Sequence, residues 1–374
     1  MKQGWEIKKL GDVCDILDSQ RKPVAKKDRR EGCYPYYGAT GIQDYVDSYI
    51  FDGRYLLVGE DGAKWGANDK TAFIAEGKCW VNNHAHILKL YNNIIDKFAE
   101  YYLVFRDLNE FITGAIVQKL TQQALRNIPI PIPPLAEQEK IVAELDCLSG
   151  IIEKKKQQLK EYETLAQSIF YEMFGNPIDN EKGWEYEKLS NKAEISSSKR
   201  IFANEYSDSG IPFYRGKEIT EKSKGNPISV ELFISQKRFE EIKLKYGIPA
   251  IGDILVTAVG TIGNIWVVDS DEPFYFKDGN VLWLKIKDDT NPIYFKYILT
   301  ILIDEYKEMM ANGCAYSALT IANLKDMPTC ITPLALQQEF ASKIEAIEKQ
   351  KELIKQSIAE TETLFNSRMD YYFN

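Results

Sequence analysis

The chain has 374 residues, of which 44% are hydrophobic and 12% aromatic, and its formal net charge is −8 at pH 7. This composition supports folded cores and excludes a disordered chain, while the length leaves room for two or three domains. The acidic balance argues against a free-standing nucleic-acid-binding protein, because counterion release requires a positive face. The apolar runs are short and no signal-peptide core opens the chain, so we expect a soluble, cytoplasmic protein.

Residues 1–133 are predicted to form a mixed α/β lobe. Strand-like runs occupy Tyr55–Val58 and Ile87–Leu90, and apolar residues at helical spacing favour a helix from Asp96 to Asn109. The prolines between residues 129 and 134 predict a stiff, extended connector, because proline fixes φ and disfavours the α region for the residue before it.

A long helix is predicted from Pro134 to Phe174. Its apolar and small residues recur at alternating steps of four and three, and only Lys155 interrupts the series. This heptad spacing is typical of a helix that buries one narrow stripe against a partner helix. At 1.5 Å per residue the helix would be roughly 55–60 Å long. Gly175 and Pro177 end it, so we take residues 134–175 as a spacer segment.

The rest of the chain repeats this plan. Gly4–Glu6 recurs as Gly183–Glu185, and Pro134–Ala136 recurs as Pro333–Ala335, each time with a glutamine two residues later. Such internal self-similarity indicates a duplicated architecture.

The repeat predicts a second lobe over residues 176–332 and a second spacer helix over residues 333–374. Within the second lobe we expect strands at Ile254–Val256 and Val281–Leu284 and a helix from Pro292 to Met310.

Together these elements predict an α+β fold, with two pseudo-repeated mixed α/β lobes separated by two long antiparallel coiled-coil helices. Antiparallel pairing would turn the sequence repeat into a pseudo-two-fold axis. The second helix is less regular, because the polar residues Lys351, Thr361 and Arg368 take seam positions. Two alternatives therefore stay open: each helix packs on its own lobe, or each pairs with another chain.

The sequence lacks catalytic signatures. It contains no GxSxG elbow, no P-loop, no GxGxxG motif and no Asn/Asp-Pro-Pro-aromatic signature of an amino-group methyltransferase. His84 and His86 would share one face of a strand, but no cysteine or carboxylate at close spacing completes a metal site. We expect hydrogen bonding from these histidines, and we predict no catalytic residue and no metal ligand.

Binding features are better represented. Residues 21–30 are rich in lysine and arginine, and a basic pair lies at the equivalent place in the second lobe. These cations either form a solvated surface or contact phosphates. Amide and basic side chains, the types that read base edges in a groove, cluster around the middle of each lobe. The candidate nucleic-acid contacts of the first lobe are Lys22, Lys26, Lys27, Arg29, Arg30, Tyr37, Thr40, Gln43, Lys64, Trp65, Asn82, Asn83 and His84. Those of the second lobe are Lys199, Arg200, Arg215, Lys217, Thr257, Thr261, Lys277 and Asn280.

Each candidate taken alone is also explained as a turn or core residue, so the distribution of charge matters more. The first lobe is nearly neutral as a whole and contains a basic segment, whereas the helices and the second lobe are acidic. Such a protein can specify a sequence while basic partner subunits supply most of the phosphate contacts.

The order and duplication of these motifs resemble the specificity subunit of type I restriction–modification systems. The resemblance is carried by Gly-Trp-Glu at the start of each half and by Pro-Leu-Ala-x-Gln after Leu-Thr-x-x-x-Leu-x-x-Ile-Pro. It covers essentially the whole chain. Tyr34–Gly53, Gly59–Gly62 and Asn82–His86 look like a recurring target-recognition domain of that family.

The resemblance implies a non-catalytic subunit that reads an asymmetric bipartite target in double-stranded DNA, one half-site per lobe. It further implies two adenine methyltransferase (modification) subunits, which bind S-adenosylmethionine, and motor/nuclease (restriction) subunits. No cofactor is then expected in this chain, with S-adenosylmethionine, ATP and Mg on the partner subunits. Cys330 and Thr332 stand where the first half has prolines, so equal docking of methyltransferase at both helices is in doubt.

Two other functions remain open. One is a non-catalytic coiled-coil scaffold with two ligand-binding lobes and no DNA role. The other is a stand-alone enzyme whose site lacks a familiar motif. Sequence-selective DNA binding that is weak for the chain alone and strong with a methyltransferase partner would distinguish the DNA specificity subunit from both.

Overall fold

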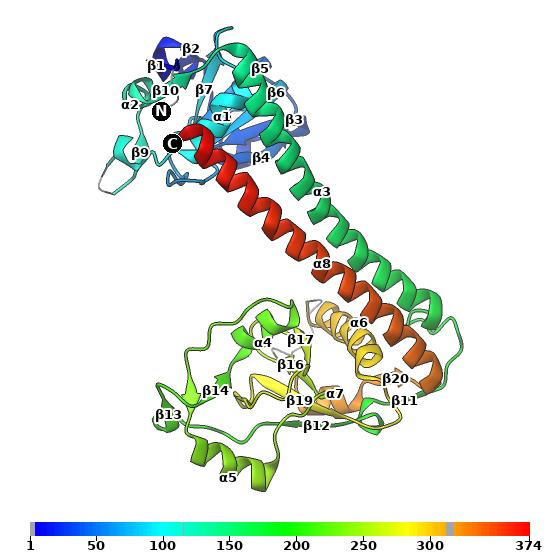
Figure 1. Ribbon diagram of the computed structural model, residues 1–374. Coiled ribbons are helices and arrows are strands. Elements are labelled where there is room, and N and C mark those ends of the chain that lie inside the picture. Colours follow the sequence, from blue (N-terminus) through cyan, green and yellow to red (C-terminus); the bar gives the residue numbers. More distant parts are fainter. Residues whose placement is uncertain (1–3, 115, 312–317) are drawn as a thin grey trace. The chain divides into compact units, whose positions relative to one another are not determined.

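The structure is a computed structural model that describes residues 4–114, 116–311 and 318–374. The chain divides into two compact units (Figure 1): unit 1 comprises Met1–Gln157 and Lys355–Asn374, and unit 2 comprises Gln158–Ile354. Each unit therefore holds one lobe and parts of both long helices. No helix within the described residues has the length and apolar character needed to cross a membrane.

A six-stranded sheet forms the first lobe, in the order β2-β7-β5-β6-β3-β4. The predicted runs at Tyr55–Val58 and Ile87–Leu90 fall within β5 and β7, which are neighbouring inner strands of this sheet. β5 pairs antiparallel with both β6 and β7, whereas β3 and β6 run parallel. The strands are β2 (Cys14–Ile16), β3 (Glu31–Gly38), β4 (Gly41–Val46), β5 (Phe51–Gly59), β6 (Ala72–Val81) and β7 (Ala85–Leu90).

The two faces of this sheet bury separate cores. Leu56, Val58 and Leu88 point toward helix α1 (Asp96–Phe105), while Leu57 and Ile87 belong to the other core. This follows from the period of two along a strand, which sends successive side chains to opposite faces. Both faces are apolar, so the lobe is stabilised from both sides of β5.

Helix α1 ends four residues before the predicted Asn109. Arg106 already has extended backbone angles. Asp107 then accepts a hydrogen bond from the backbone N–H of Asn109 at 2.9 Å, a local turn that competes with continuing the helix. The remaining elements of this lobe are β8 (Ile112–Thr113), β9 (Lys119–Leu120), α2 (Gln122–Asn127) and the short 3-10 turns at Leu10–Asp12, Asp18–Gln20, Lys26–Asp28 and Asn109–Phe111.

The proline connector is extended, as predicted, and forms strand β10 (Pro129–Ile132), which pairs with β1 (Glu6–Lys9). The pair is a two-stranded sheet with two edges, where a residue without an N–H is tolerated. In unit 2 the equivalent pair is β11 (Tyr186–Lys188) with β20 (Pro328–Cys330).

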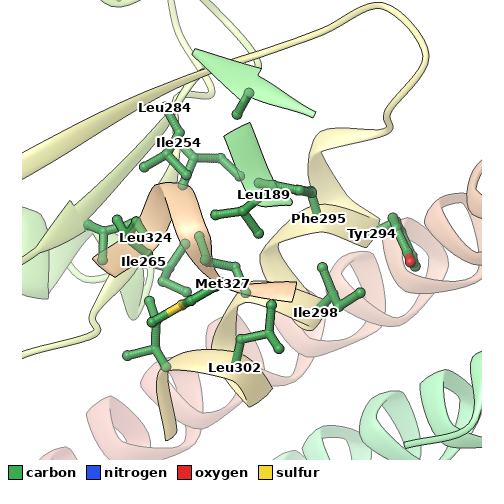
Figure 2. Close-up of a cluster of buried hydrophobic side chains, with 14 of the residues drawn as sticks. Leu189, Ile254, Ile265, Leu284, Tyr294, Phe295, Ile298, Leu302, Leu324 and Met327 are labelled. Carbon is green, nitrogen blue, oxygen red and sulfur yellow. The ribbon is translucent and has the colours of Figure 1, made fainter. Parts of the chain in front are cut away.

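Two four-stranded sheets make up the second lobe, in the orders β12-β19-β16-β17 and β13-β15-β14-β18. Their strands are β12 (Ala193–Ser197), β13 (Tyr206–Ser207), β14 (Ile211–Tyr214), β15 (Phe233–Ile234), β16 (Ile254–Thr257), β17 (Ile265–Val267), β18 (Tyr275–Phe276) and β19 (Val281–Ile286). The helices are α4 (Gly216–Ser223), α5 (Gln236–Tyr246), α6 (Pro292–Ala311) and α7 (Ile321–Asp326), with 3-10 turns at Leu189–Asn191 and Ala203–Glu205. Figure 2 shows α6 packing Phe295, Ile298 and Leu302 against a core that includes Ile254 and Leu284 of the first sheet.

The two long helices are α3 (Leu135–Phe174) and α8 (Leu334–Phe373), each of 40 residues, and they pack together in opposite directions (Figure 1). In unit 1 the early part of α3 meets the late part of α8, because Arg368 Nη2 lies 3.0 Å from Glu144 Oε2. In unit 2 the late part of α3 meets the early part of α8, since the rings of Phe170 and Phe340 are 5.6 Å apart. The predicted pairing is therefore confirmed, and the helices do not merely lie on their own lobes.

Polar seam positions of the helix pair find partners. Lys155 donates to Ser357 of the opposite helix, and Lys351 Nζ lies 3.8 Å from Glu163 of the opposite helix. Arg368 pairs with Glu144, as described above, while Thr361 bonds along its own helix to the carbonyl oxygen of Ser357. Such bonds favour one register of the two helices over others.

A buried glutamine fixes the start of each long helix. Gln138 accepts from the backbone N–H of Ile95 at 2.8 Å and donates to the carbonyl oxygen of Pro133 at 2.8 Å. In unit 2, Gln337 accepts from Asn291 N at 2.8 Å and donates to Thr332 O at 2.9 Å. The glutamine of the Pro-Leu-Ala-x-Gln repeat thus satisfies buried backbone groups where lobe and helix join.

Candidate nucleic-acid interface

Polar side chains gather at one end of the first-lobe sheet, where the turn before β7 meets strand β4. Asn82 is buried, and its Nδ2 donates to Gln43 Oε1 at 3.2 Å. Its Oδ1 accepts from the backbone N–H of His84 at 2.8 Å, and the His84 ring contacts Asp61. Three residues predicted separately from the sequence therefore lie together, with Asn82 as the buried support of the exposed Gln43 and His84.

Exposure sorts the first-lobe candidates into two groups. Trp65 is buried and donates its indole N–H to the carbonyl oxygen of Gly59 at 3.1 Å, so it serves the core. Tyr37 is half-buried against Phe73. The exposed candidates at this end of the lobe are Thr40, Gln43, Lys64, Asn83 and His84.

A buried ionic network lies next to these turns and stabilises them. Arg21 bonds to the Glu60 carboxylate, to the Ala85 carbonyl oxygen at 2.8 Å and to Asp18 at 3.4 Å. Lys119 Nζ reaches Glu60 at 2.6 Å. The network thereby connects the segment before β3, the end of β5, the start of β7 and the β8–β9 hairpin.

His86 belongs to this network, whereas His84 does not. Its Nδ1 lies 2.6 Å from Asp18 and its Nε2 lies 2.7 Å from the Leu120 carbonyl oxygen, so both ring nitrogens have hydrogen-bond partners within the lobe. The histidines therefore bond within the lobe, as expected, and they do not form a pair on one face. His84 precedes β7 in a turn.

Asp18, Glu60 and His86 bring ligand atoms within 4.8 Å of one another, a grouping that sequence spacing could not indicate. The arrangement does not suit a metal ion. Both nitrogens of His86 already have hydrogen-bond partners, and the cations Arg21 and Lys119 bind the Glu60 carboxylate. The cluster is a compensated ionic network.

We expect the first lobe to lose stability in acid through Asp18. Burial would raise the pKa of Asp18, but hydrogen bonding and the charge of His86, together with Arg21, hold it below its usual value of 3.8. The folded lobe then binds fewer protons than the unfolded chain, so the stabilisation is complete above that value and is lost as the pH falls through the lowered pKa. Hydrogen exchange of β5 and β7 amides between pH 5 and 3 measures this loss.

Asp18→Asn should make the first lobe's exchange less dependent on pH over that range, while Asp28→Asn, a change at an exposed aspartate of the same segment, should leave the dependence as it was. An unchanged profile for Asp18→Asn would contradict the assignment. Amides of the second lobe serve as the internal reference.

The basic segment between residues 21 and 30 is held by its backbone against side chains of strands β3 and β6. The Tyr36 hydroxyl lies 3.0 Å from the backbone nitrogen of Val24, and Trp80 donates to the Lys22 carbonyl oxygen at 2.6 Å. Arg29 stacks on Tyr36 and pairs with Asp44 at 3.1 Å. The exposed cations of the segment are Lys22, Lys26, Lys27 and Arg30.

In the second lobe most of the predicted cations are paired with carboxylates. Arg215 bonds to Glu218 and Glu231, and these hydrogen bonds, that of Glu218 first, raise the pKa of its guanidinium. Lys217 also binds Glu231 at 2.9 Å. Farther along the chain, Arg200 and Lys277 lie 2.7 and 3.9 Å from Asp278.

The second-lobe threonines have different surroundings. Thr257 is buried and bonds within its own turn, donating to the Thr261 carbonyl oxygen and accepting from the Asn264 backbone N–H. Thr261 and Asn280 are exposed.

The two lobes share a backbone frame at this end. In the first, Glu60 N donates to His84 O at 2.8 Å, and Leu120 N donates to Glu60 O at 2.8 Å. In the second, Ala258 N donates to Asn280 O at 2.8 Å, and Leu319 N donates to Ala258 O at 3.1 Å. Asn280 thus takes the place of His84 on an equivalent frame, and the same frame presents different side chains.

One basic cluster was not predicted from the sequence. The Nζ atoms of Lys199 and Lys245 lie 5.5 and 5.4 Å from the centre of the Tyr246 ring. Lys199 follows β12, and its backbone N–H donates to Tyr275 at 2.6 Å, whereas Lys245 lies in the last turn of α5. The two lysines are far apart in the sequence, so no local pattern connects them. Lys245 alone is not informative either, because cations near a helix C-terminus are common owing to the helix dipole.

The comparisons with known proteins agree with this architecture. A family model described as the type I restriction modification DNA specificity domain matches residues 2–161 and 181–363. A putative type I restriction enzyme specificity subunit of Haemophilus influenzae is 33% identical over 372 residues, covering 98% of this chain and 94% of that protein. The MjaIX specificity subunit of Methanocaldococcus jannaschii is 22% identical and covers 92% of this chain and 86% of its own length.

Solved structures show the same fold. The S subunit of a type I restriction–modification system from M. genitalium superposes with a TM-score of 0.60 at 15% identity, over 99% of this chain and 97% of that one.

The structure combines two α+β lobes with a scaffold of two paired long helices, the fold that it shares with the S subunit from M. genitalium. The chain belongs to the family of type I restriction–modification DNA specificity subunits. It is the non-catalytic DNA specificity subunit of such a system, and members of this family carry no cofactor themselves. Assembly of a type I restriction–modification complex implies three kinds of partner for this chain: modification subunits, restriction subunits and DNA.

Proposed function

We propose that the chain reads an asymmetric bipartite target in double-stranded DNA, with residues 1–133 recognising one half-site and residues 176–332 the other. The observation that carries this proposal is the shared backbone frame, on which His84 in one lobe is replaced by Asn280 in the other. Equivalent frames that present different side chains read different base edges, so the target is not a palindrome.

In the first lobe we assign base contacts to the exposed Thr40, Gln43, Asn83 and His84. Their positions depend on the buried Asn82 and on the ionic network below it. Lys22, Lys26, Lys27 and Arg30 contact backbone phosphates, because exposed cations outside the ion pairs described above can replace counterions of DNA.

In the second lobe we assign base contacts to Thr261 and Asn280 and phosphate contacts to Lys199 and Lys245. Arg215 and Lys217 are less suited to phosphate, because Glu231 binds both and Glu218 also holds Arg215. A DNA phosphate would have to compete with those carboxylates.

The long helices, residues 134–175 and 333–374, act as the spacer between the recognition lobes. Two methyltransferase subunits and the motor/nuclease subunits assemble with this scaffold, and the adenines to be methylated lie within the two half-sites. S-adenosylmethionine, ATP and Mg belong to those partners.

Neutralising two basic-segment lysines should weaken DNA binding without altering its sequence preference. For the complex with methyltransferase, Lys26→Gln/Lys27→Gln should reduce the slope of log binding constant against log salt by about 1–2, because each lost phosphate contact removes about 0.9. Salt titration with target and non-target duplexes measures the change.

Lys78→Gln/Lys89→Gln is the matched control, since it removes two exposed lysines from strands of the same sheet. A double variant at 26 and 27 that binds DNA like this control would contradict the assignment of the basic segment.

A further inference from the structure

An exposed apolar tip closes the hairpin of β8 and β9 in the first lobe. Ile116 is 97% exposed and Val117 is 66% exposed, and neither residue belongs to a buried core of the lobe. Gly114 has a φ of +101°, and a Cβ atom at this position would clash with the Val117 carbonyl oxygen, so the tight turn requires glycine. The tip thus holds two adjacent aliphatic side chains in solvent, where a partner can cover them.

The base of this hairpin is joined to the turns to which we assign base contacts. Lys119 Nζ binds Glu60 at 2.6 Å, and the backbones of Lys119 and Asp61 form a β-bridge. Asp61 in turn contacts the ring of His84. The tip therefore stands at the same end of the lobe as His84, and the buried ionic network anchors its base.

The size and surroundings of the tip favour DNA over a protein as the partner. The neighbours of the aliphatic pair along the hairpin include the polar residues Thr113, Gln118 and Lys119. A stable protein interface buries about 800 Å² on each partner, far more than two aliphatic side chains can supply. Proteins that deform DNA, in contrast, insert individual apolar side chains between neighbouring base pairs, which partly unstacks the bases and kinks the duplex.

We propose that the β8–β9 tip inserts Ile116, with Val117 beside it, between base pairs of the half-site that the first lobe reads. The proposal rests on the proposed function of this lobe and adds an apolar wedge to the polar base contacts. Pyrimidine–purine steps unstack more easily than other steps, so the free energy of insertion depends on the sequence of the step. Specificity at this step is then obtained without a hydrogen bond to a base edge.

Unstacking is measured with target duplexes that each carry 2-aminopurine at one position, because the fluorescence of this base rises when it leaves the stack. The protein is the full chain in complex with methyltransferase. The methylated adenine is not substituted, since a methyltransferase extrudes its target base by its own action. The unaltered chain should raise the fluorescence at adjacent positions of the first half-site. Ile116→Ser/Val117→Ser should abolish this rise and weaken target binding by about tenfold, because the apolar contact is lost.

Ile7→Ser is the matched control, since Ile7 is also exposed, at 47%, but lies on β1 and outside the hairpin. It should leave both the fluorescence and the affinity as they were. Ile116→Leu/Val117→Leu keeps the tip apolar and should retain the fluorescence rise. Unchanged fluorescence with the serine pair, or an equal loss with Ile7→Ser, would overturn the proposal.

The salt dependence of binding separates the wedge from a phosphate contact. Apolar insertion releases no counterions from phosphates, so the slope of log binding constant against log salt should be the same for the serine pair and the unaltered chain. A fall in this slope like that expected of Lys26→Gln/Lys27→Gln would overturn the proposal. Weaker binding of methyltransferase by the serine pair in the absence of DNA would also overturn it, because the tip would then be a protein contact.

Failure of the wedge is distinguishable from failure of the proposed function. If the first lobe reads no half-site, the lysine pair at 26 and 27 and the serine pair at the tip should both bind DNA like the unaltered chain. If only the wedge is wrong, the lysine pair still reduces the salt slope and the serine pair alone has no effect.

Discussion

Exchange of residues 1–133 for the equivalent lobe of another specificity subunit is expected to change one half of the methylated target and leave the other half as it was. The reason is that the side chains that we assign to base contacts in each lobe are supported by that lobe alone. Asn82 and the Arg21–Glu60 network position the first set, and the Thr257 turn positions the second. Methylome sequencing of a host that carries the hybrid with its partner subunits reads both halves directly.

The exchange has a structural requirement. Phe373 packs on Phe98 and Tyr102 of α1, and Phe365 packs on Tyr101, so the incoming lobe must present comparable aromatic residues to α8. The experiment therefore uses a hybrid whose incoming lobe keeps these three aromatic residues of α1. The reciprocal exchange of residues 176–332 is its control and should change only the other half. If either hybrid altered both halves or neither, modular recognition would be wrong.

Replacing Arg21 by methionine is expected to destabilise the first lobe by about 3–5 kcal/mol, because removing one partner of a buried ionic cluster leaves the others uncompensated. Arg21 bonds to Glu60, to Asp18 and to the Ala85 carbonyl oxygen, and all three groups are shielded from solvent. Native-state hydrogen exchange of β5 and β7 amides measures this local free energy, with second-lobe amides as reference. Sequence-selective DNA binding should fall in parallel, since the turn that bears His84 ends directly before Ala85.

Arg30→Met is the control, since Arg30 is an exposed arginine of the same segment, and its effect should stay within about 0.5 kcal/mol. Comparable exchange rates for the two variants would show that the network contributes little to the lobe. Lys119→Met should have a smaller effect than Arg21→Met, because Lys119 is more exposed.

The sequence by itself determined the architecture. Heptad spacing located both long helices to within a residue of their observed starts, because a stripe at steps of four and three can be buried only along one face of a helix. The repeat of Gly-Trp-Glu and Pro-Leu-Ala-x-Gln identified the duplication. Short apolar runs located central strands of both lobes, since strands buried on both faces are apolar throughout.

The tertiary structure decided which polar residues can serve a site. Trp65 and Thr257 looked like contacts in the sequence, yet both are buried, because composition near a turn does not reveal the direction of a side chain. Arg215 and Lys217 were candidate contacts, but Glu218 and Glu231 form ion pairs with them in the folded lobe.

Long-range pairing produced the features that no local pattern contained. Asp18, Glu60 and His86 meet only because β5 and β7 pair beside the segment that follows β2. Lys199 and Lys245 meet over Tyr246 for the same kind of reason. Periodicity is a local property that survives in a single sequence, whereas a site is a set of contacts between distant segments, and those contacts are fixed only when the sheets and helices pack.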